Sequence, residues 1–175
     1  MDRVIFIDRD GVINRDPIGD YIKRWKDFKF LPGVISSLKK LSDQGFKIIV
    51  ISNQAGIGDG KYPESALEEI TLKMVSALER RGVKLHAIHY CLHGKRAGCP
   101  CRKPKTLLFK LASKGLNYSK RSTYFIGDKD SDEKAAKRFG LKYIHVLTGH
   151  GRIHADKVHP HHTAKNLKDA VDWLL

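Results

Sequence analysis

The chain has 175 residues, 41% of them hydrophobic and 9% aromatic, which is the composition of a folded domain and excludes a disordered segment. This length fits one domain spanning residues 1–175, since single domains typically run to about 100 to 200 residues. The N-terminus reaches Asp8 after only four apolar residues, too few for a signal peptide, and no apolar run approaches the roughly 20 residues of a membrane span. We therefore expect a cytoplasmic protein with no membrane partner, and a monomer by default.

The formal net charge is +14. Such a charge attracts nucleic acid, an anionic membrane or a phosphorylated substrate, and does not choose among them. Because the lysines are scattered through every segment, a solvated basic surface is the simpler interpretation. The choice of partner therefore depends on the motifs.

In chain order, the first strand is predicted at residues 4–7, and a helix with apolar residues at 34, 38 and 41 follows between Gly33 and Gly45. The second strand is predicted at 46–51. Pro63 opens the longest internal helix, which ends at Gly82, and the third strand covers 85–90. The rest alternates in the same way: helix 107–111, strand 123–126, helix 135–139, strand 143–147 and helix 167–174.

Strands that alternate with helices predict a doubly wound α/β fold, with a mainly parallel sheet and helices on both faces. A stretch rich in histidine, at residues 150–162, is expected in a surface loop. In such folds the ligand lies beyond the carboxyl ends of the strands. The polar residues that directly follow the strands therefore form the candidate site.

Asp8 and Asp10 follow the first strand and are two residues apart, so their side chains point to the same side if strand geometry continues. In such a pair, one carboxylate can ionise and act as nucleophile or metal ligand. Its neighbour, disfavoured from ionising by the adjacent charge, can hold a proton as general acid. Asp128 and Asp132 follow the fourth strand and add oxygen ligands of the kind that Mg²⁺ prefers.

Ser52 can donate a hydroxyl and Lys103 a positive charge to a phosphoryl group. Each of these residues has a plainer interpretation. Asp130 or Ser131 can begin the next helix as a cap, Ser52-Asn53 can be turn residues, and Lys103 can be solvated surface. Their conjunction at successive strand ends favours catalysis.

The three cysteines lie within eleven residues, in an arrangement that suggests a metal site rather than a disulfide framework. With one histidine they supply the four ligands of a structural zinc site: Cys91, His93, Cys99 and Cys101. The zinc loop, residues 91–103, ends with Arg102 and Lys103. Bound zinc would thereby position two cations beside the pocket.

These residues, in this order, resemble the haloacid dehalogenase superfamily of phosphotransferases. The matching motifs are Asp8-Arg9-Asp10-Gly11-Val12, Ser52, Lys103, and Gly127-Asp128 with Asp132. The zinc loop followed by Lys103-Pro104 narrows the resemblance to the branch of heptose bisphosphate and histidinol phosphatases, over residues 3 to 150. The spacing of the motifs leaves no room for a large cap domain.

The resemblance implies that Asp8 attacks phosphorus to form an aspartyl-phosphate, and that Asp10 protonates the leaving alkoxide and then activates water. It also implies that Mg²⁺ is held by the Asp8 carboxylate, the backbone carbonyl of Asp10 and Asp128. Ser52 and Lys103 are expected to bind the phosphoryl oxygens.

Within the branch, the residues after the first and fifth strands are more similar to the heptose enzymes. The implied substrate is a small sugar bisphosphate, D-glycero-D-manno-heptose 1,7-bisphosphate, dephosphorylated at position 7 during synthesis of a lipopolysaccharide precursor. The expected substrate contacts are Asp16, Tyr21, Ser52, Asn53, Gln54, Arg102, Lys103 and Lys129. The sequence departs from the family at Ala55 and Asp59, and in two extra residues before Tyr21; these changes concern substrate contacts and not the reaction.

Three alternatives stay open. The five-residue gap between His93 and Cys99 also suits a histidinol-phosphate phosphatase. A polynucleotide 3′-phosphatase could use the same catalytic motifs with the basic surface on a nucleic-acid backbone, and its binding would weaken steeply with salt. A noncatalytic basic zinc module that binds nucleic acid is disfavoured, because the four aspartates would repel phosphates; nucleic acid is not the expected partner.

Overall fold

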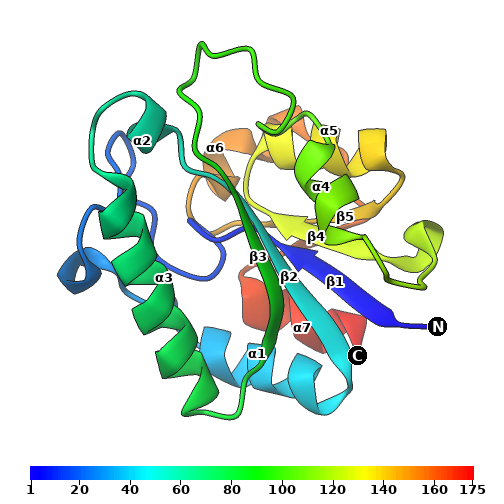
Figure 1. Cartoon of the computed structure of the whole chain (residues 1–175). Coiled ribbons are helices and arrows are strands. Elements are labelled where there is room, and N and C mark those ends of the chain that lie inside the picture. Colours follow the sequence, from blue (N-terminus) through cyan, green and yellow to red (C-terminus); the bar gives the residue numbers. More distant parts are fainter.

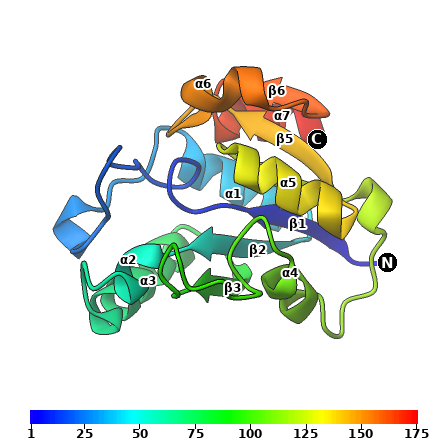
Figure 2. The same ribbon diagram turned by 90° about the horizontal axis from the view of Figure 1, so that it is seen from above.

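A computed structural model describes all residues, 1–175, and shows one sheet of six parallel strands in the order β3-β2-β1-β4-β5-β6. Figure 2 shows this succession from β3 at one edge to β6 at the other. The strands are β1 (Arg3–Ile7), β2 (Phe46–Asn53), β3 (Leu85–Cys91), β4 (Tyr124–Gly127), β5 (Lys142–Val146) and β6 (His162–Ala164). The five predicted strands and the doubly wound fold are thereby confirmed.

The predicted helices are also present, with different bounds for some. The α-helices are α1 (Val34–Asp43), α2 (Ala55–Gly58), α3 (Glu64–Glu79), α4 (Leu107–Ala112), α5 (Asp130–Phe139), α6 (Gly151–His154) and α7 (Leu167–Leu174). Three short 3-10 helices lie at Trp25–Asp27, Lys120–Ser122 and Ala155–Lys157. The surface loop expected at residues 150–162 is wrong in part, since α6, a 3-10 turn and the start of β6 lie there.

The two faces of the sheet are covered by different helices, because successive residues of a strand point to opposite faces. Ile5 and Ile7 of β1 pack with α1, α3 and α7, whereas Val4 and Phe6 pack with α4 and α5. Figure 1 shows α1 and α7 side by side on the first face, with α4 and α5 on the other. The strands are therefore buried between two helical layers.

The order of the strands reverses direction at β1, which lies between β2 and β4. At such a switch point the connections leave on opposite sides and open a crevice beyond the carboxyl end of the strand. Two loops stand over this end, one between β1 and α1 and one between β3 and α4 (Figure 1). No separate cap domain is present, and none of the helices is long and apolar enough to cross a membrane.

Candidate active site

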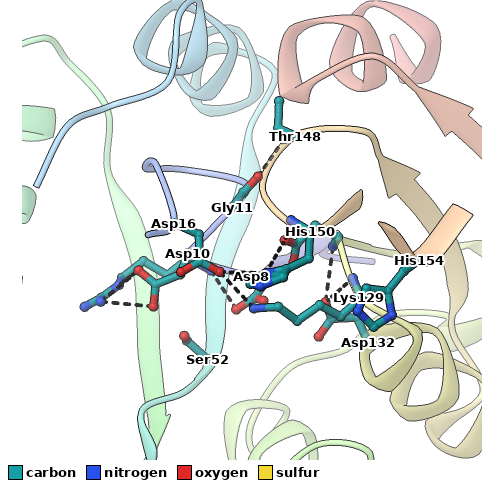
Figure 3. A network of polar contacts seen from close by, with 12 residues as sticks. Asp8, Asp10, Gly11, Asp16, Ser52, Lys129, Asp132, Thr148, His150 and His154 are labelled. Carbon is teal, nitrogen blue, oxygen red and sulfur yellow. Dashed lines mark hydrogen bonds and ion pairs between the residues drawn. The ribbon is translucent and has the colours of Figure 1, made fainter. Parts of the chain in front are cut away.

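Asp8 lies at the carboxyl end of β1 and is only 4% exposed (Figure 3). Its Oδ1 is 3.0 Å from Nζ of Lys103, which is itself 3% exposed and reaches Oδ1 of Asp132 at 2.7 Å. The same Nζ donates to the carbonyl oxygen of Ile51 at 3.0 Å. Burial alone would lower the pKa of Lys103, but Asp132 and Asp8 outweigh it and raise that pKa above its ordinary value. Lys103 is thus a fully charged, buried cation and not solvated surface.

Carboxylate oxygens of Asp8, Asp128 and Asp132 lie within 4.8 Å of one another, and all three side chains are buried. Oδ2 of Asp128 accepts a hydrogen bond of 2.8 Å from the backbone N–H of His150, whereas its Oδ1 is buried without a hydrogen-bond partner. A buried carboxylate oxygen with no partner is costly unless a cation binds it. The donor set of oxygens and the unpartnered Oδ1 therefore fit Mg²⁺.

Two glycines close around Asp128. A Cβ atom on Gly11 would lie 2.2 Å from Oδ2 of Asp128, and one on Gly149 would lie 2.3 Å from the same oxygen. Both glycines also have positive φ, +88° and +56°, which other residues rarely adopt. The backbone of two loops can thus approach the carboxylate only because neither position carries a side chain.

Asp132 has two roles in the protein scaffold. Its Oδ2 accepts from the backbone N–H groups of Asp128 and Lys129, at 3.2 and 3.1 Å, which are the two residues directly before α5, and so fixes the start of that helix. Its Oδ1 pairs with Lys103. The helix itself begins at Asp130, as the plainer interpretation predicts, but Lys129 and not Asp130 or Ser131 occupies the cap position. Asp130 pairs with Lys134 on the surface.

Three side chains donate hydrogen bonds to the Asp10 carboxylate. Arg9 donates to Asp10 from Nε and Nη2, Asn14 Nδ2 donates to its Oδ1 at 2.9 Å, and Gln54 Nε2 donates to its Oδ2 at 2.7 Å. Burial raises the pKa of Asp10, but Arg9 and these hydrogen bonds outweigh it, and the pKa lies below its ordinary value.

Asp8 shows the opposite shift. Burial raises its pKa to about 6 against the effect of Lys103, and Asp132 adds to the rise. The protein groups alone therefore reverse the expected order, in which Asp10 is the carboxyl that resists ionisation. The reason is Arg9, a buried cation whose pairing with Asp10 the spacing of the motif does not reveal. A divalent cation beside Asp8 would favour its ionised form.

Ser52 and Asn53 end β2. The Ser52 hydroxyl is buried and accepts a hydrogen bond of 3.0 Å from Gln54 Nε2. The Asn53 side chain binds both backbone polar groups of Lys103, at 3.2 and 3.0 Å. Asn53 therefore connects the end of β2 to the residue that contacts Asp8.

A cavity of about 840 Å³ opens above these residues. Of the expected catalytic and substrate residues, it is lined by Asp8, Asp10, Asp16, Tyr21, Ser52, Asn53, Arg102, Lys103 and Lys129. Gln54 is absent from the lining and lies buried behind it. The lining also includes cations that were not expected there, Lys61, Lys95 and Arg96, and the imidazole of His150.

The Asp16 carboxylate lies close to two side chains from the loops after β4 and β5. Its Oδ2 is 3.1 Å from Nζ of Lys129 and 3.0 Å from Nδ1 of His150 (Figure 3). Burial lowers the pKa of His150, and the neighbouring Lys129 lowers it further. Nothing in the spacing of the His-rich stretch pointed to His150, because it reaches the cavity only through the turn after β5.

The four residues of the zinc loop come together. The ligand atoms of Cys91, His93, Cys99 and Cys101 lie within 4.8 Å of one another, with Sγ of Cys91 3.6 Å from Cys99 and 3.2 Å from Cys101. Nδ1 of His93 is 3.1 Å from Sγ of Cys101. These separations exceed the about 2.05 Å of a disulfide bond. They approach the about 3.8 Å between sulfurs bound to a tetrahedral zinc at about 2.3 Å, so the cluster can hold a metal ion.

The comparisons with known proteins agree with this geometry. The HAD-hydrolase-like family matches residues 100–170. A D-glycero-beta-D-manno-heptose-1,7-bisphosphate 7-phosphatase of Helicobacter pylori is 34% identical and covers 98% of this chain and 97% of its own. The histidine biosynthesis bifunctional protein HisB of Campylobacter jejuni is 35% identical over 80% of this chain, but over only 40% of its own length.

Among solved structures, D,D-heptose 1,7-bisphosphate phosphatase from B. bronchiseptica, complexed with magnesium and phosphate, superposes with a TM-score of 0.92. Its sequence is 27% identical, and the match covers 98% of this chain and 97% of that one. The motifs, the fold and the full-length relatives agree. The chain is a phosphatase of the haloacid dehalogenase-like family, in the branch that includes the D-glycero-D-manno-heptose-1,7-bisphosphate 7-phosphatases.

Proposed function

We propose that this phosphatase, as one domain over residues 1–175, removes the 7-phosphate of D-glycero-D-manno-heptose 1,7-bisphosphate. The observation that carries the proposal is the buried pairing of Asp8 with Lys103 at 3.0 Å, beside the carboxylates of Asp128 and Asp132 and at the floor of a polar cavity. A carboxylate placed beside a cation in this way can meet a phosphoryl group as nucleophile while the cation neutralises its oxygens.

The proposed magnesium ligands are the carboxylates of Asp8 and Asp128 and the backbone carbonyl of Asp10. The unpartnered Oδ1 of Asp128 supports this site. The similar phosphatase from B. bronchiseptica is complexed with magnesium and phosphate, which supports it as well. When bound, Mg²⁺ supplies charge neutralisation at the phosphoryl oxygens and keeps Asp8 ionised.

In the proposed reaction, a carboxylate oxygen of Asp8 forms a bond to phosphorus as the bond from phosphorus to the sugar oxygen breaks. Asp10 enters this step in its protonated form, although Arg9 and the other donors around it favour the ionised form in the free protein, and gives its proton to that leaving oxygen. Asp10 then takes a proton from water, which attacks the aspartyl-phosphate and releases phosphate and free Asp8. Ser52 and Lys103 bind the phosphoryl oxygens throughout.

The remaining lining suits a substrate with a second phosphate. Asp16 and Tyr21 can bind sugar hydroxyls, and Arg102 the distal phosphate. Gln54 was expected to contact the substrate directly. It lies behind Asp10 and Ser52 and donates hydrogen bonds to both, so we propose that it acts through them. Lys129 neutralises Asp16 at 3.1 Å and remains close to the phosphoryl site.

The Cys/His cluster is proposed to hold zinc as a structural ion. Four protein ligands leave no position for a reacting water, so this metal would fix the loop that ends at Arg102 and Lys103. Cysteines that form no disulfide suit a reducing compartment, which supports the cytoplasm as the place of action. The lipopolysaccharide precursor is proposed as the product from the similarity to the heptose phosphatases.

Phosphate release tests the proposed function. The wild type and Asp8→Asn would be assayed with Mg²⁺ and after chelation on both anomers of the heptose bisphosphate, on histidinol phosphate and on a 3′-phosphorylated oligonucleotide. Asp130→Asn, a change in an acid that pairs with Lys134 on α5, is the matched control. We expect release from the heptose substrate that requires Mg²⁺ and Asp8. Release that survives Asp8→Asn would contradict the mechanism.

Histidinol phosphate is the second candidate substrate, because the HisB relative matches 80% of this chain. A higher kcat/KM on histidinol phosphate than on the heptose bisphosphate would replace the substrate and keep the mechanism. Preference for the oligonucleotide, together with steep loss of activity with salt, would indicate the polynucleotide alternative.

A further inference from the structure

Tyr62 is a buried residue that the proposed reaction does not use. It lies between α2 and α3, is 6% exposed, and donates a hydrogen bond of 2.7 Å from its hydroxyl to Oε1 of Gln54. Burial raises the pKa of Tyr62 well above its ordinary value, so the phenol keeps its proton at working pH. The hydroxyl is therefore a permanent donor at the back of the cavity.

Gln54 connects Tyr62 to Asp10 and Ser52 by hydrogen bonds. Its Nε2 donates to Oδ2 of Asp10 at 2.7 Å and to Oγ of Ser52 at 3.0 Å. With Tyr62 donating to the amide oxygen and Oδ2 of Asp10 accepting from the amide nitrogen, both ends of the Gln54 side chain favour one orientation. Arg9 and Asn14 contact Asp10 from the loop after β1, and Gln54 contacts it from the position directly after β2.

The ring of Tyr62 is fixed as well. Its centroid is 5.8 Å from that of Tyr21, which lines the cavity. A Cβ on Gly56 would lie 2.4 Å from Cε1 of Tyr62 and 3.0 Å from Cγ of Tyr21, so the two rings pack over a position that must be glycine. Little freedom remains for the hydroxyl to leave Gln54.

We infer that Tyr62 is a positioning residue that acts through Gln54 to hold Asp10 in line for proton transfer to the leaving oxygen. The inference rests on the proposed role of Asp10. The inference predicts a larger loss of activity on a substrate with a poor leaving group, which needs the general acid, than on one with a good leaving group, which does not. A residue that merely supported the fold would affect both substrates alike.

The test compares Tyr62→Phe with the wild type on heptose 1,7-bisphosphate, an alkyl phosphate, and on p-nitrophenyl phosphate, an aryl phosphate. We expect kcat/KM to fall by roughly tenfold on the alkyl substrate and to stay within about twofold on the aryl one, since a hydrogen bond to a charged network contributes of the order of one power of ten. Phenylalanine keeps the ring that packs on Tyr21 and removes only the hydroxyl.

Two further measurements separate positioning from support of the fold. Gln54→Leu should lower the ratio of alkyl to aryl kcat/KM at least as much as Tyr62→Phe, and Tyr62→Phe added to Gln54→Leu should lower it no further. Tyr118→Phe is the matched control: its hydroxyl bonds Ser113 at 2.6 Å on another face, and its removal should leave the ratio unchanged.

An equal loss on both substrates, or an equal effect of Tyr62→Phe with and without Gln54, would overturn the inference while leaving the phosphatase mechanism intact. Failure of the wild type to release phosphate from either substrate with Mg²⁺ would instead remove the proposed function itself. Thermal unfolding of each variant allows every rate to be compared at the same folded fraction.

Discussion

Asn53 binds Lys103 by both of its backbone groups: Nδ2 of Asn53 donates to the carbonyl oxygen of Lys103 at 3.2 Å, and its Oδ1 accepts from the Lys103 N–H at 3.0 Å. The last residue of the zinc loop is thereby fixed to the end of β2. Since Nζ of Lys103 pairs with Asp8, this clamp sets the position of the cation relative to the nucleophile.

Asn53→Ala is expected to lower kcat by about 10- to 100-fold, because small displacements of a positioning cation reduce transition-state stabilisation strongly. Two lost hydrogen bonds of about 1 kcal/mol each would also lower the Tm by several degrees. Asn53→Asp keeps the acceptor and loses the donor, so its kcat should lie between those of Asn53→Ala and the wild type. An unchanged kcat in Asn53→Ala would show that Lys103 needs no such clamp.

Removal of the metal from the Cys/His cluster should affect the phosphate site. Cys101→Ser is expected to lose about one equivalent of zinc and to raise KM and lower kcat together, because Arg102 and Lys103 follow Cys101 directly. Elemental analysis and kinetics with saturating Mg²⁺ would measure both effects. His86→Gln, a change in an exposed histidine of β3, should keep the metal and the activity. Full activity in a zinc-free Cys101→Ser would contradict the proposed role of the loop.

The sequence predicted most of the fold because most of its strands are apolar runs and because glycine follows α1, α3, α4 and α5 within three residues. It did not predict β6, since His162–Ala164 has three residues and only one of them is buried. This strand forms by pairing with β5, and such pairing leaves no local pattern in the sequence.

The residues that approach the candidate site were recognisable where they directly follow a strand, as Asp8, Ser52 and Asp128 do. His150 and Tyr62 were not, because their contacts depend on how segments far apart in the sequence pack. Arg9 was not either, because its pairing with the adjacent Asp10 depends on the burial of its side chain. Asn14 lies among the residues after the first strand, but its hydrogen bond to Asp10 is visible only in the structure.

The ion pairs of Asp172 should make the stability of the fold depend on pH. Hydrogen bonds with Lys168 and then with Lys40 lower the pKa of Asp172 to about 2, and the second connects α7 to α1. The folded-state pKa lies below the ordinary aspartate value of 3.8, so the stabilisation is present above about pH 4 and is lost as the pH falls towards 2.

Asp172→Asn should therefore lower the urea midpoint at pH 6, and the difference from the wild type should shrink as the pH is lowered below 4. The exposure of this pair makes the effect small and reduces it in high salt. Asp43→Asn, which removes an ion pair with Lys39 within α1 alone, is the control. A difference that grew at low pH would show that the sign of the linkage is wrong.

The junction between α2 and the zinc loop depends on Gly58. A Cβ at Gly58 would lie 2.1 Å from the backbone nitrogen of Gly94 and 2.8 Å from the carbonyl oxygen of Leu92, so two backbones meet there without room for a methyl group. Beside it, Oδ1 of Asp59 accepts from the backbone N–H of Lys95 at 3.2 Å. The loop is therefore positioned from α2 as well as by its metal ligands.

Gly58→Ala is expected to lower the Tm by about 2 to 10 °C and to raise KM, because the backbone of the zinc loop would have to move away from α2 and carry Arg102 with it. Asp59→Asn retains an acceptor for the Lys95 N–H and should change KM by less than about threefold. Thermal unfolding, zinc retention against a chelator and steady-state kinetics would measure these effects. Should Gly58→Ala keep the wild-type KM and zinc retention, α2 would not position the loop, and the metal ligands alone would determine where Arg102 lies.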